Sequence, residues 1–456
     1  MTPISPDARP SRAGRSARPF LAAATGVTLC LALVSGLLTA SALERGPRLR
    51  TTVGDTALTV QRPGVTLGMR ADQPLADTST EGVRVDPPSD VDVEVEGATL
   101  RVRFLSPLDF GTDYRIVAPN LRGRSTGAAA AAEFAFRTPS LTVTTLERGG
   151  AYDRTGGEDR IVRHDVLSGG ESTLFSAGRI QEYAVDGDSL VALVRDEAGR
   201  AALRRVGADG TTSLAAPGDG TVGLVRVSAD ATRVGFVYSG PGPDGTSYLN
   251  TLFALDLEEP GARPQPVRGV GGIPLLADAW FFLPGSSYLV AQSPDATLTL
   301  VDASGAAPAR RLGEVGTLRA VLPGATSVVV EGPTGAAILD LTDGSLTPAP
   351  VSSPSGEISA GSLLVSPTSS LSWDAATVRL DDSQRSLFTA APGERIDEVC
   401  LAPSGRHVLV GTVPAGAVVD GYPARAEWVG RTSTVVEVAT GARVATLAGT
   451  RPSWCD

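Results

Sequence analysis

One short pattern recurs along most of this chain and constrains its fold more than any other feature. It consists of an apolar strand, an acidic or small residue and a glycine turn. It occurs seven times, at residues 165–170, 206–210, 256–261, 302–305, 340–344, 380–383 (a degenerate copy) and 437–441. Successive copies begin roughly 38 to 56 residues apart. A period in this range indicates an array of similar β-units, such as the blades of a β-propeller.

A second repeat alternates with the first and supplies the remaining strands. Turns rich in Pro, Asp and Gly occur at residues 183–187, 227–230, 282–285, 321–324, 365–368 and 401–405, and an apolar strand soon follows each. Two strands around a tight turn form a hairpin. The alternation therefore predicts an inner and an outer hairpin in each unit, which gives four strands per blade.

The two ends of the repeat array predict how it closes. There are seven outer turns and six inner ones, so one blade lacks its inner strands in chain order. We expect residues 451–456 to form one more innermost strand and residues 141–146 to form the strand beside it. The predicted fold is all-β, with a seven-bladed propeller whose first blade combines one C-terminal strand with three N-terminal ones. Six or eight blades are the alternatives. Such closure removes open sheet edges.

Cysteine placement agrees with this closure. The three cysteines are Cys30, Cys400 and Cys455, and the last two lie on predicted innermost strands, in the last full blade and in the closing strand. Neighbouring inner strands converge near the axis, where a Cα separation of ~5–6 Å suits a disulfide. We expect a disulfide between Cys400 and Cys455 that closes a loop of about 55 residues. Two buried free thiols are the alternative.

The N-terminal residues predict the compartment. Residues 1–18 contain four arginines, and residues 19–43 are uncharged. A stretch of this length can cross a bilayer as a helix, and the arginines predict a cytoplasmic tail. We expect a single-pass membrane protein whose C-terminal domains are extracellular, where a disulfide can persist. A cleaved signal peptide, with a small-residue site at residues 40–42, would instead give a secreted protein.

Residues 51–138 are predicted to form a separate β-sandwich, because short alternating strands follow one another at regular spacing. We expect strands at residues 57–60, 65–69, 91–95, 99–104, 114–117 and 133–137. Residues 97–104, 108–117 and 134–139 resemble bacterial Ig-like domains, in which a strand precedes a Gly-Thr-x-Tyr turn and a closing Phe-x-Phe-x-Thr strand. The resemblance implies a spacer or adhesive module. The acidic residues within 90–96 are expected to form a solvated strand face, with a weak calcium site as the alternative.

The propeller region, residues 139–456, resembles the TolB-like and WD-type bacterial families. The resemblance depends on the Ala-Pro-Ser-Gly-Arg motif at residues 402–406 and on Leu-Asp-Leu turns. These motifs are structural, so the resemblance implies blades and leaves the ligand open. The aromatic residues at 280–282 and Trp454 are expected to pack between blades.

The sequence contains no recognisable catalytic or metal-binding constellation. It has two histidines, His164 and His407, and no Gly-x-Ser-x-Gly elbow, so a Ser-His-Asp hydrolase is not expected. Three cysteines and two separated histidines lack the spacing of a zinc site. No lysine occurs, which excludes Schiff-base chemistry. We therefore assign no catalytic, cofactor-binding or metal-binding residue and no cofactor. Both histidines are expected to pack at turns or on the surface.

Net charge narrows the class of partner. The formal net charge is −10, which argues against nucleic acid. The leading hypothesis is a non-catalytic, membrane-anchored binding or scaffold protein, held in the membrane through residues 19–43, whose propeller loop faces bind a protein, a peptide or a cell-wall ligand. One alternative is a propeller-type hydrolase or lyase with a dispersed axial site. Another is an accessory sensor domain for an envelope signalling system.

Overall fold

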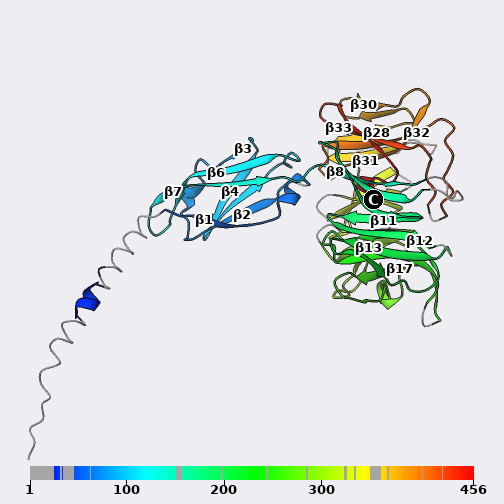
Figure 1. The fold of residues 1–456 in the computed structure, drawn as a ribbon, viewed down its shortest axis with the longest axis horizontal. Helices are drawn as coiled ribbons and strands as arrows, with labels where there is room; N and C mark the ends of the chain where they lie inside the picture. The colour runs from blue at the N-terminus through cyan, green and yellow to red at the C-terminus, as the bar shows by residue number, and fades with distance from the viewer. Residues whose placement is uncertain are drawn as a thin grey trace, which may run out of the picture. The chain divides into compact units, whose positions relative to one another are not determined.

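The computed structural model describes residues 25–30, 33, 46–61, 63–149, 157–196, 199–242, 245–283, 286–322, 326–332, 335–349, 361–366, 369–402, 404–423 and 425–455. The chain divides into two compact units, Met1–Thr138 and Pro139–Asp456. Apart from the helical residues 25–30 and 33, the described parts of both units consist of β-strands with a few short 3-10 helices (Figure 1).

The N-terminal unit contains two antiparallel sheets, with strand orders β1-β2-β5-β4 and β3-β6-β7. The strands are β1 (Leu49–Val53), β2 (Thr66–Ala71), β3 (Arg84–Asp86), β4 (Val91–Glu96), β5 (Thr99–Phe104), β6 (Asp113–Arg122) and β7 (Ala129–Arg137); the 3-10 helices are η1 (Thr56–Val60) and η2 (Asp77–Thr80). Side chains of a strand alternate between its two faces, so each sheet turns one face inward.

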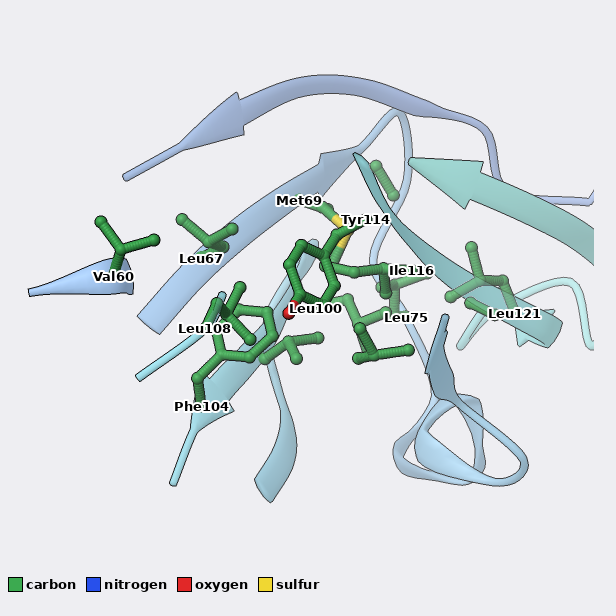
Figure 2. Close-up of a cluster of buried hydrophobic side chains, with 14 residues drawn as sticks. Val60, Leu67, Met69, Leu75, Leu100, Phe104, Leu108, Tyr114, Ile116 and Leu121 are labelled. Atoms are coloured by element: carbon green, nitrogen blue, oxygen red, sulfur yellow. The ribbon is translucent and has the colours of Figure 1, made fainter. Parts of the chain in front are cut away.

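A single hydrophobic core connects these two sheets (Figure 2). Leu67 of β2, Leu100 and Phe104 of β5 and Ile116 of β6 are almost completely buried. Two phenylalanines of β7 stack on one another and pack against this core from the edge, where they stay partly exposed. The unit is therefore a two-layer sandwich whose two sheets share one core.

Two sequence predictions for this unit have different outcomes. The acidic segment does form a solvated face, because the carboxylates of β4 point outward and pair with Arg101 and Arg103 of β5, while its valines pack on the core. The strand predicted at residues 57–60 is wrong. The carboxylate of Asp55 accepts the N–H of Ala57 at 2.8 Å, and this cap starts η1 instead.

The second unit contains, in its described residues, one three-stranded sheet followed by six four-stranded sheets, each with neighbouring strands in chain order. The strands are β8 (Thr142–Glu147), β9 (Asp159–Asp165), β10 (Glu171–Ala177), β11 (Ile180–Asp186), β12 (Ser189–Arg195), β13 (Ala201–Gly207), β14 (Gly210–Leu214), β15 (Thr221–Val227), β16 (Arg233–Pro241), β17 (Ser247–Asp256), β18 (Gln265–Pro266), β19 (Ala279–Phe282), β20 (Tyr288–Gln292), β21 (Thr297–Asp302), β22 (Arg310–Glu314), β23 (Thr317–Val321), β24 (Ser327–Gly332), β25 (Gly335–Asp340), β26 (Leu346–Pro348), β27 (Gly361–Ser366), β28 (Ser369–Trp373), β29 (Thr377–Leu380), β30 (Arg385–Thr389), β31 (Glu394–Leu401), β32 (His407–Pro414), β33 (Thr432–Glu437) and β34 (Arg443–Ala448), with 3-10 helices η3 (Val270–Gly272) and η4 (Ser453–Cys455). This series of meanders is the arrangement of a β-propeller.

The two sequence repeats correspond to two kinds of turn in these sheets. In each four-stranded sheet, the inner repeat joins the first and second strands and the outer repeat joins the third and fourth strands. The first sheet lacks its innermost strand, so its outer repeat joins β9 to β10. Hydrophobic clusters lie between neighbouring sheets. Trp280 of β19 bridges one such pair, because its indole N–H donates to the carbonyl of Leu224 in β15 at 3.1 Å. The predicted packing of this aromatic residue between blades is therefore confirmed.

Arginines link successive sheets at the outer turns. In four cases the guanidinium group of one sheet donates to the carbonyl of the residue that follows the turn acid of the next sheet. The pairs are Arg205 with Leu257, Arg233 with Ala303, Arg310 with Leu341 and Arg385 with Val438. The repeated acidic turn therefore presents a carbonyl to a donor from the neighbouring sheet, and the planar guanidinium suits this contact because it carries several N–H groups in a fixed fork.

The predicted closing strand at residues 451–456 is wrong in form. The C-terminal segment pairs with β8 through one bridge, between Leu146 and Thr450, and then turns into η4. Arg451 has φ of 53°, which is not an extended conformation, and Pro452 has no N–H to donate to a ladder. These two residues end the pairing after a single bridge, although the segment does lie beside β8 as expected.

Little of the predicted membrane span falls on described residues. Residues 25–30 and 33 are helical, and the rest of 19–43 lies outside the part of the chain that the structure describes. Within that part, none of the helices combines the length and the apolar character that crossing a membrane requires.

Candidate functional site at the junction of the first and last sheets

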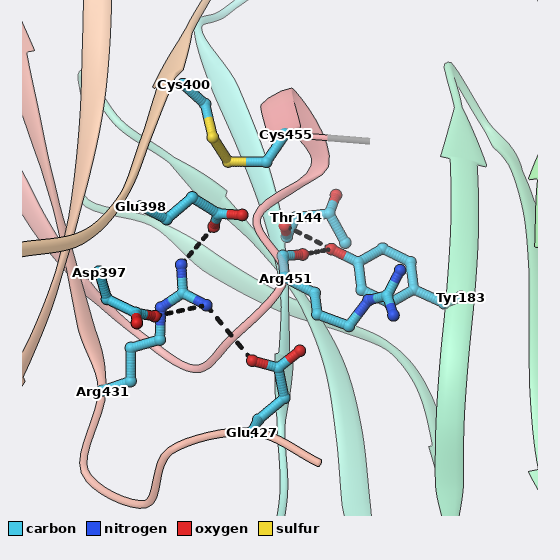
Figure 3. Close-up of a disulfide and its surroundings, with 9 residues drawn as sticks. All are labelled: Thr144, Tyr183, Asp397, Glu398, Cys400, Glu427, Arg431, Arg451 and Cys455. Carbon is cyan, nitrogen blue, oxygen red and sulfur yellow. Dashed lines mark hydrogen bonds and ion pairs between the residues drawn. A yellow bond between two sulfur atoms is a disulfide. The ribbon is translucent and has the colours of Figure 1, made fainter. Parts of the chain in front are cut away.

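The C-terminal segment lies between the first, second and last sheets of the second unit. Thr450 and Leu146 exchange backbone hydrogen bonds of 2.8 Å. The hydroxyl of Tyr183 in β11 lies 2.6 Å from the carbonyl oxygen of Thr144 and 2.5 Å from that of Arg451 (Figure 3). One buried tyrosine of the second sheet thus holds both β8 and the C-terminal segment.

A disulfide adds a covalent link at this junction. Cys400 of β31 and Cys455 of η4 are bonded, with a Cα–Cα separation of 5.2 Å and a sequence separation of 55 (Figure 3). The bond joins the last sheet to the segment that pairs with the first sheet. Close by, the indole N–H of Trp454 donates to the carbonyl of Thr142 at 3.1 Å.

The segment between β32 and β33, described at residues 415–423 and 425–431, contributes several side chains to the site. This segment folds back as a small hairpin, in which the N–H of Asp420 donates to the carbonyl of Glu427 and that of Val429 to Val418, both at 2.9 Å. The carboxylate of Asp420 accepts the N–H groups of Tyr422 and Glu427 and so fixes the bend. We call residues 415–423 and 425–431 the junction hairpin.

Asp159 is the best-connected acid of the site. It is fully buried at the start of β9. Its carboxylate accepts the N–H of Gly149 at 3.0 Å, the N–H of Ile180 at 2.7 Å and the hydroxyl of Tyr422 at 2.7 Å. The donors come from the first sheet, the second sheet and the junction hairpin of the last sheet. One carboxylate therefore ties three sheets together.

Arg148 makes a parallel set of contacts. Its guanidinium donates to Asp420 at 2.5 Å, to the carbonyl of Arg425 at 3.0 Å and to the carbonyl of Gln181 at 2.9 Å. It also lies over the ring of Tyr422, 3.8 Å from the centroid. Both side chains of the Arg148–Asp420 pair are only 5% exposed, so this ion pair is desolvated and depends on its geometry.

Arg431 and Arg451 hold the remaining acids. Arg431 pairs with Glu427 at 3.3 Å, with Asp397 at 3.7 Å and with Glu398, as Figure 3 shows. Arg451 pairs with Glu182 of β11 at 3.1 Å, and both side chains are almost fully buried. Glycine at position 411 makes room for Arg431, because a Cβ there would lie 2.7 Å from Nη2. The site is a dense arrangement of charges from all three sheets.

We call this set the junction cluster; its members are Arg148, Asp159, Glu182, Asp397, Glu398, Asp420, Tyr422, Glu427, Arg431 and Arg451. Burial raises the pKa of Glu427 above its ordinary value, although Arg431 and three other arginines act in the opposite direction. Burial, the hydrogen bond to Asp159 and the negative charge of Asp159 raise the pKa of Tyr422, so this hydroxyl stays protonated. Burial lowers and three nearby acids raise the pKa of Arg431, with a net rise that keeps it charged.

The chemistry of the cluster follows from its pairing. Each of its acids has an arginine, the Tyr422 hydroxyl or a backbone N–H as partner. Such a network fixes the position of the elements that carry it. One group among the described residues has metal-ligand spacing, namely Glu398, Cys400 and Cys455, with ligand atoms within 4.8 Å of each other. Both sulfur atoms belong to the disulfide and Glu398 pairs with Arg431, so thiolate ligands are not offered.

The residues singled out from sequence lie in several places. Cys400 and Cys455 are at the junction, whereas the two histidines are outside it. His164 does not lie on the surface or in a turn; it is 1% exposed within β9 and contacts the hydroxyl of Thr145 at 2.9 Å and the carboxylate of Glu171 at 3.1 Å. His407 begins β32.

Sequence reasoning missed most of the junction cluster. Three of its pairs join residues 263 to 272 apart in sequence: Asp159 with Tyr422, Arg148 with Asp420 and Glu182 with Arg451. The usable signal was the length of the segment between β32 and β33, which is far longer than a tight turn and carries four charged residues. Long connections in compact domains are often functional.

Comparison with known proteins identifies no relative by sequence. No known family profile matches the chain, and no curated protein is significantly similar to it. Solved structures resemble the fold distantly. They include a quinonprotein alcohol dehydrogenase-like protein from Bacteroides thetaiotaomicron (TM-score 0.41, 12% identity, 90% of this chain and 100% of that one). They also include an auxiliary nutrient binding protein from the same organism (0.36, 10%, 87% and 99%) and the dihydro-heme d1 dehydrogenase NirN (0.40, 12%, 74% and 72%). Likenesses this remote carry no argument about activity or ligand.

Proposed function

We propose that this chain is a membrane-anchored, extracytoplasmic binding protein, in which a seven-bladed propeller follows an Ig-like spacer and binds a protein partner. The blade number is inferred from the seven successive sheets of the second unit, the first of which is completed by the bridge at Thr450. The Ig-like assignment is inferred from the two sheets of the N-terminal unit and their shared core.

The proposal assigns binding to one of the two propeller faces. In a meander, the connections between second and third strands and those between successive sheets lie at the same end of the strands. We call this end the loop face; it contains the junction hairpin and residues 267–278, which connect β18 to β19. The chain enters the second unit at the opposite end, where β8 begins.

Exposed aliphatic side chains on this face are the observation that carries the proposal. The junction hairpin exposes Val418, Val419 and Val429, and the region around 267–278 exposes Leu249, Val270, Ile273 and Leu276, with exposed fractions from 41% to 71%. Each of these two loops exposes at least three aliphatic side chains, and exposed apolar groups that cluster on a loop indicate an interaction surface. Aliphatic groups favour a protein or peptide over a polar glycan, because a partner must offer apolar surface in return.

Both apolar loops are held in one conformation. Residues 268 and 274 form a bridge, and the turn between them has Gly271 and Gly272 at φ of 75° and 76°, where other residues would be strained. The junction cluster holds the other loop through Arg148 and Asp159. A rigid loop loses little conformational entropy on binding, which suits recognition.

The proposed compartment depends on residues 19–43 as an anchor, with the N-terminus cytoplasmic and both units outside the cell; a cleaved leader would give a secreted form with the same binding face. A disulfide at the junction agrees with an oxidising compartment. The comparison of membrane and culture fractions with an antibody to the second unit separates the two forms.

Site-specific photo-crosslinking tests the binding face. A photoreactive phenylalanine analogue is placed at Ile273, at Val419 or, as a matched control, at Leu346, which is 50% exposed on the outermost strand β26. In the native cell, the full chain labelled at positions 273 and 419 should crosslink to the same protein, and the position 346 variant should not. Equal labelling at all three positions, or crosslinks to wall glycan only, would refute a protein-binding loop face. Identification of a sensor kinase would assign the accessory sensor role.

A further inference from the structure

In the N-terminal unit, β7 is an edge strand whose outer side has no neighbouring strand. β7 is the last strand of the sheet β3-β6-β7, and within the described residues it pairs with β6 alone. It is nine residues long, contains no proline, and alternates exposed and half-buried side chains along its whole length. An edge of this length with free N–H and C=O groups is a template for another strand.

Two features restrict what can pair there. Gly46 packs on Ala129 and Ala130, so closely that a Cβ at position 46 would overlap both, and this covers the start of the strand. At the other end, Phe134 and Phe136 pack against the core but stay half-buried on the open side. The available part of the edge is therefore its C-terminal half, where an added strand would complete the burial of two aromatic rings.

Charges on the outer face select the partner. Arg137 pairs with Asp113 at 2.6 Å, and Glu133 pairs with Arg115 at 2.9 Å. A second copy can add antiparallel to β7 about a two-fold axis. With the axis at Ala135, Glu133 of each copy faces Arg137 of the other. Arg137 already lies opposite Asp113, and Glu133 contacts Arg115 diagonally, so each new contact joins two groups of opposite charge that keep their partners within one copy. An axis at position 133 would oppose two glutamates, and an axis at position 134 would pair no charges.

We propose that β7 pairs with β7 of a second copy about Ala135, and that the chain is a symmetric dimer through a continuous sheet of the two N-terminal units. The surface is isologous, so one register satisfies both copies and the assembly closes at two. The contact covers residues 133–137 of each copy. The inference is independent of the ligand-binding face, because it uses only the N-terminal unit.

Disulfide trapping tests the register. Facing residues of an antiparallel pair have Cα atoms ~4.5–5.5 Å apart, within the range of a disulfide. In the full chain, Ala135→Cys should therefore give a covalent dimer on a non-reducing gel after mild oxidation. Ala131→Cys, also exposed on β7, should stay monomeric because it faces no cysteine in this register. Equal trapping of both variants, or of neither, overturns the proposal.

Charge reversal tests whether these charged side chains determine the pairing of the two copies. In sedimentation experiments over a range of concentrations, Glu133→Arg should abolish the dimer. The fourfold variant Asp113→Arg/Arg115→Glu/Glu133→Arg/Arg137→Glu reverses every sign, keeps every attraction and should dimerise again. Arg101→Glu breaks comparable exposed pairs on the other sheet and should leave the dimer unchanged. A wild-type chain that is monomeric throughout, or a fourfold variant that stays monomeric, contradicts the proposal.

Discussion

Both units of this chain contain arginine–carboxylate pairs, but the pairs differ in their exposure to solvent. In the N-terminal unit the pairs lie on open strand faces, as with Arg137 and Asp113, which are 62% and 74% exposed. At the junction of the second unit, Arg148 and Asp420 are 5% exposed. Exposed pairs contribute about 0–1 kcal/mol, whereas breaking one partner out of a buried pair costs about 3–5 kcal/mol. The difference indicates that the second unit uses charge to fix its closure, and that the first leaves charge available at an edge.

Among the changes that test this comparison, Asp159→Ala should have the largest effect on stability. The variant removes the acceptor of three buried donors and should lower the free energy of unfolding of the second unit by about 3–5 kcal/mol. All four tryptophans, at positions 280, 373, 428 and 454, belong to this unit. Tryptophan fluorescence during urea unfolding therefore reports its transition alone.

Arg137→Ala is the matched change in the other unit and should leave that transition unmoved. Tyr422→Phe removes only one of the three donors to Asp159 and should give a smaller loss than Asp159→Ala. If Asp159→Ala unfolds at the wild-type urea concentration, the junction cluster does not stabilise the closure.

The disulfide should have the next largest effect. Replacement of Cys400 and Cys455 by serine should lower the free energy of unfolding by about 2–4 kcal/mol, because the bond restricts a loop of 55 residues in the unfolded chain. Thiol labelling of the denatured wild-type protein should find one free cysteine without reductant and three with it. Three labelled thiols in both conditions would show that the bond does not form.

Gly411→Ala should lower the stability of the second unit by an intermediate amount. It changes no charge and acts only by displacing a neighbouring side chain. The added Cβ would lie 2.7 Å from Nη2 of Arg431, so the guanidinium must move away from Glu398 and Glu427, at a cost of about 1–3 kcal/mol. Gly207→Ala is the control, since nothing lies within 4 Å of a Cβ at that position. Equal stability of the two variants would mean that Arg431 is not held by its packing.

Local sequence was sufficient for the parts of the fold that depend on local chemistry. The turns recur because an acid followed by a glycine is needed at each one: Asp302, for example, accepts the N–H of Ser304, and Gly305 has φ of 75°. Strand faces followed from alternation, as in β4. The failures were local as well, since Asp55 caps a helical turn at η1 and Pro452 ends the pairing of the C-terminal segment.

The junction cluster could not be predicted in the same way, because its partners meet only after the chain has closed on itself. Nothing near Asp159 in sequence indicates Tyr422, and nothing near Glu182 indicates Arg451. Isolated charges in a β-rich sequence are normally solvated, so burial of these particular ones depends on the arrangement of three sheets. The exposed valines of the junction hairpin are equally undetectable, because alternation in a short segment does not say which face is covered.

The smallest predicted effect on stability concerns Asp186 and its neighbour Asp230, which lie outside the junction cluster. It tests the cost of burying a charge at a place that does not take part in the closure. Burial and the nearby charge of Asp230 raise the pKa of Asp186 to about 6. The carboxyl is protonated in both states below pH ~4 and ionised in both above pH ~6, so its contribution to stability falls as pH rises between these values. Asp186→Asn removes this dependence and should stabilise the second unit by about 1 kcal/mol at pH 7.5, after allowance for partial solvent screening, and by much less at pH 4. Urea unfolding at the two pH values checks the difference, and an equal gain at both would assign the effect to packing. Because Asp186 lies outside the junction cluster, Asp159→Ala should leave this pH dependence unchanged.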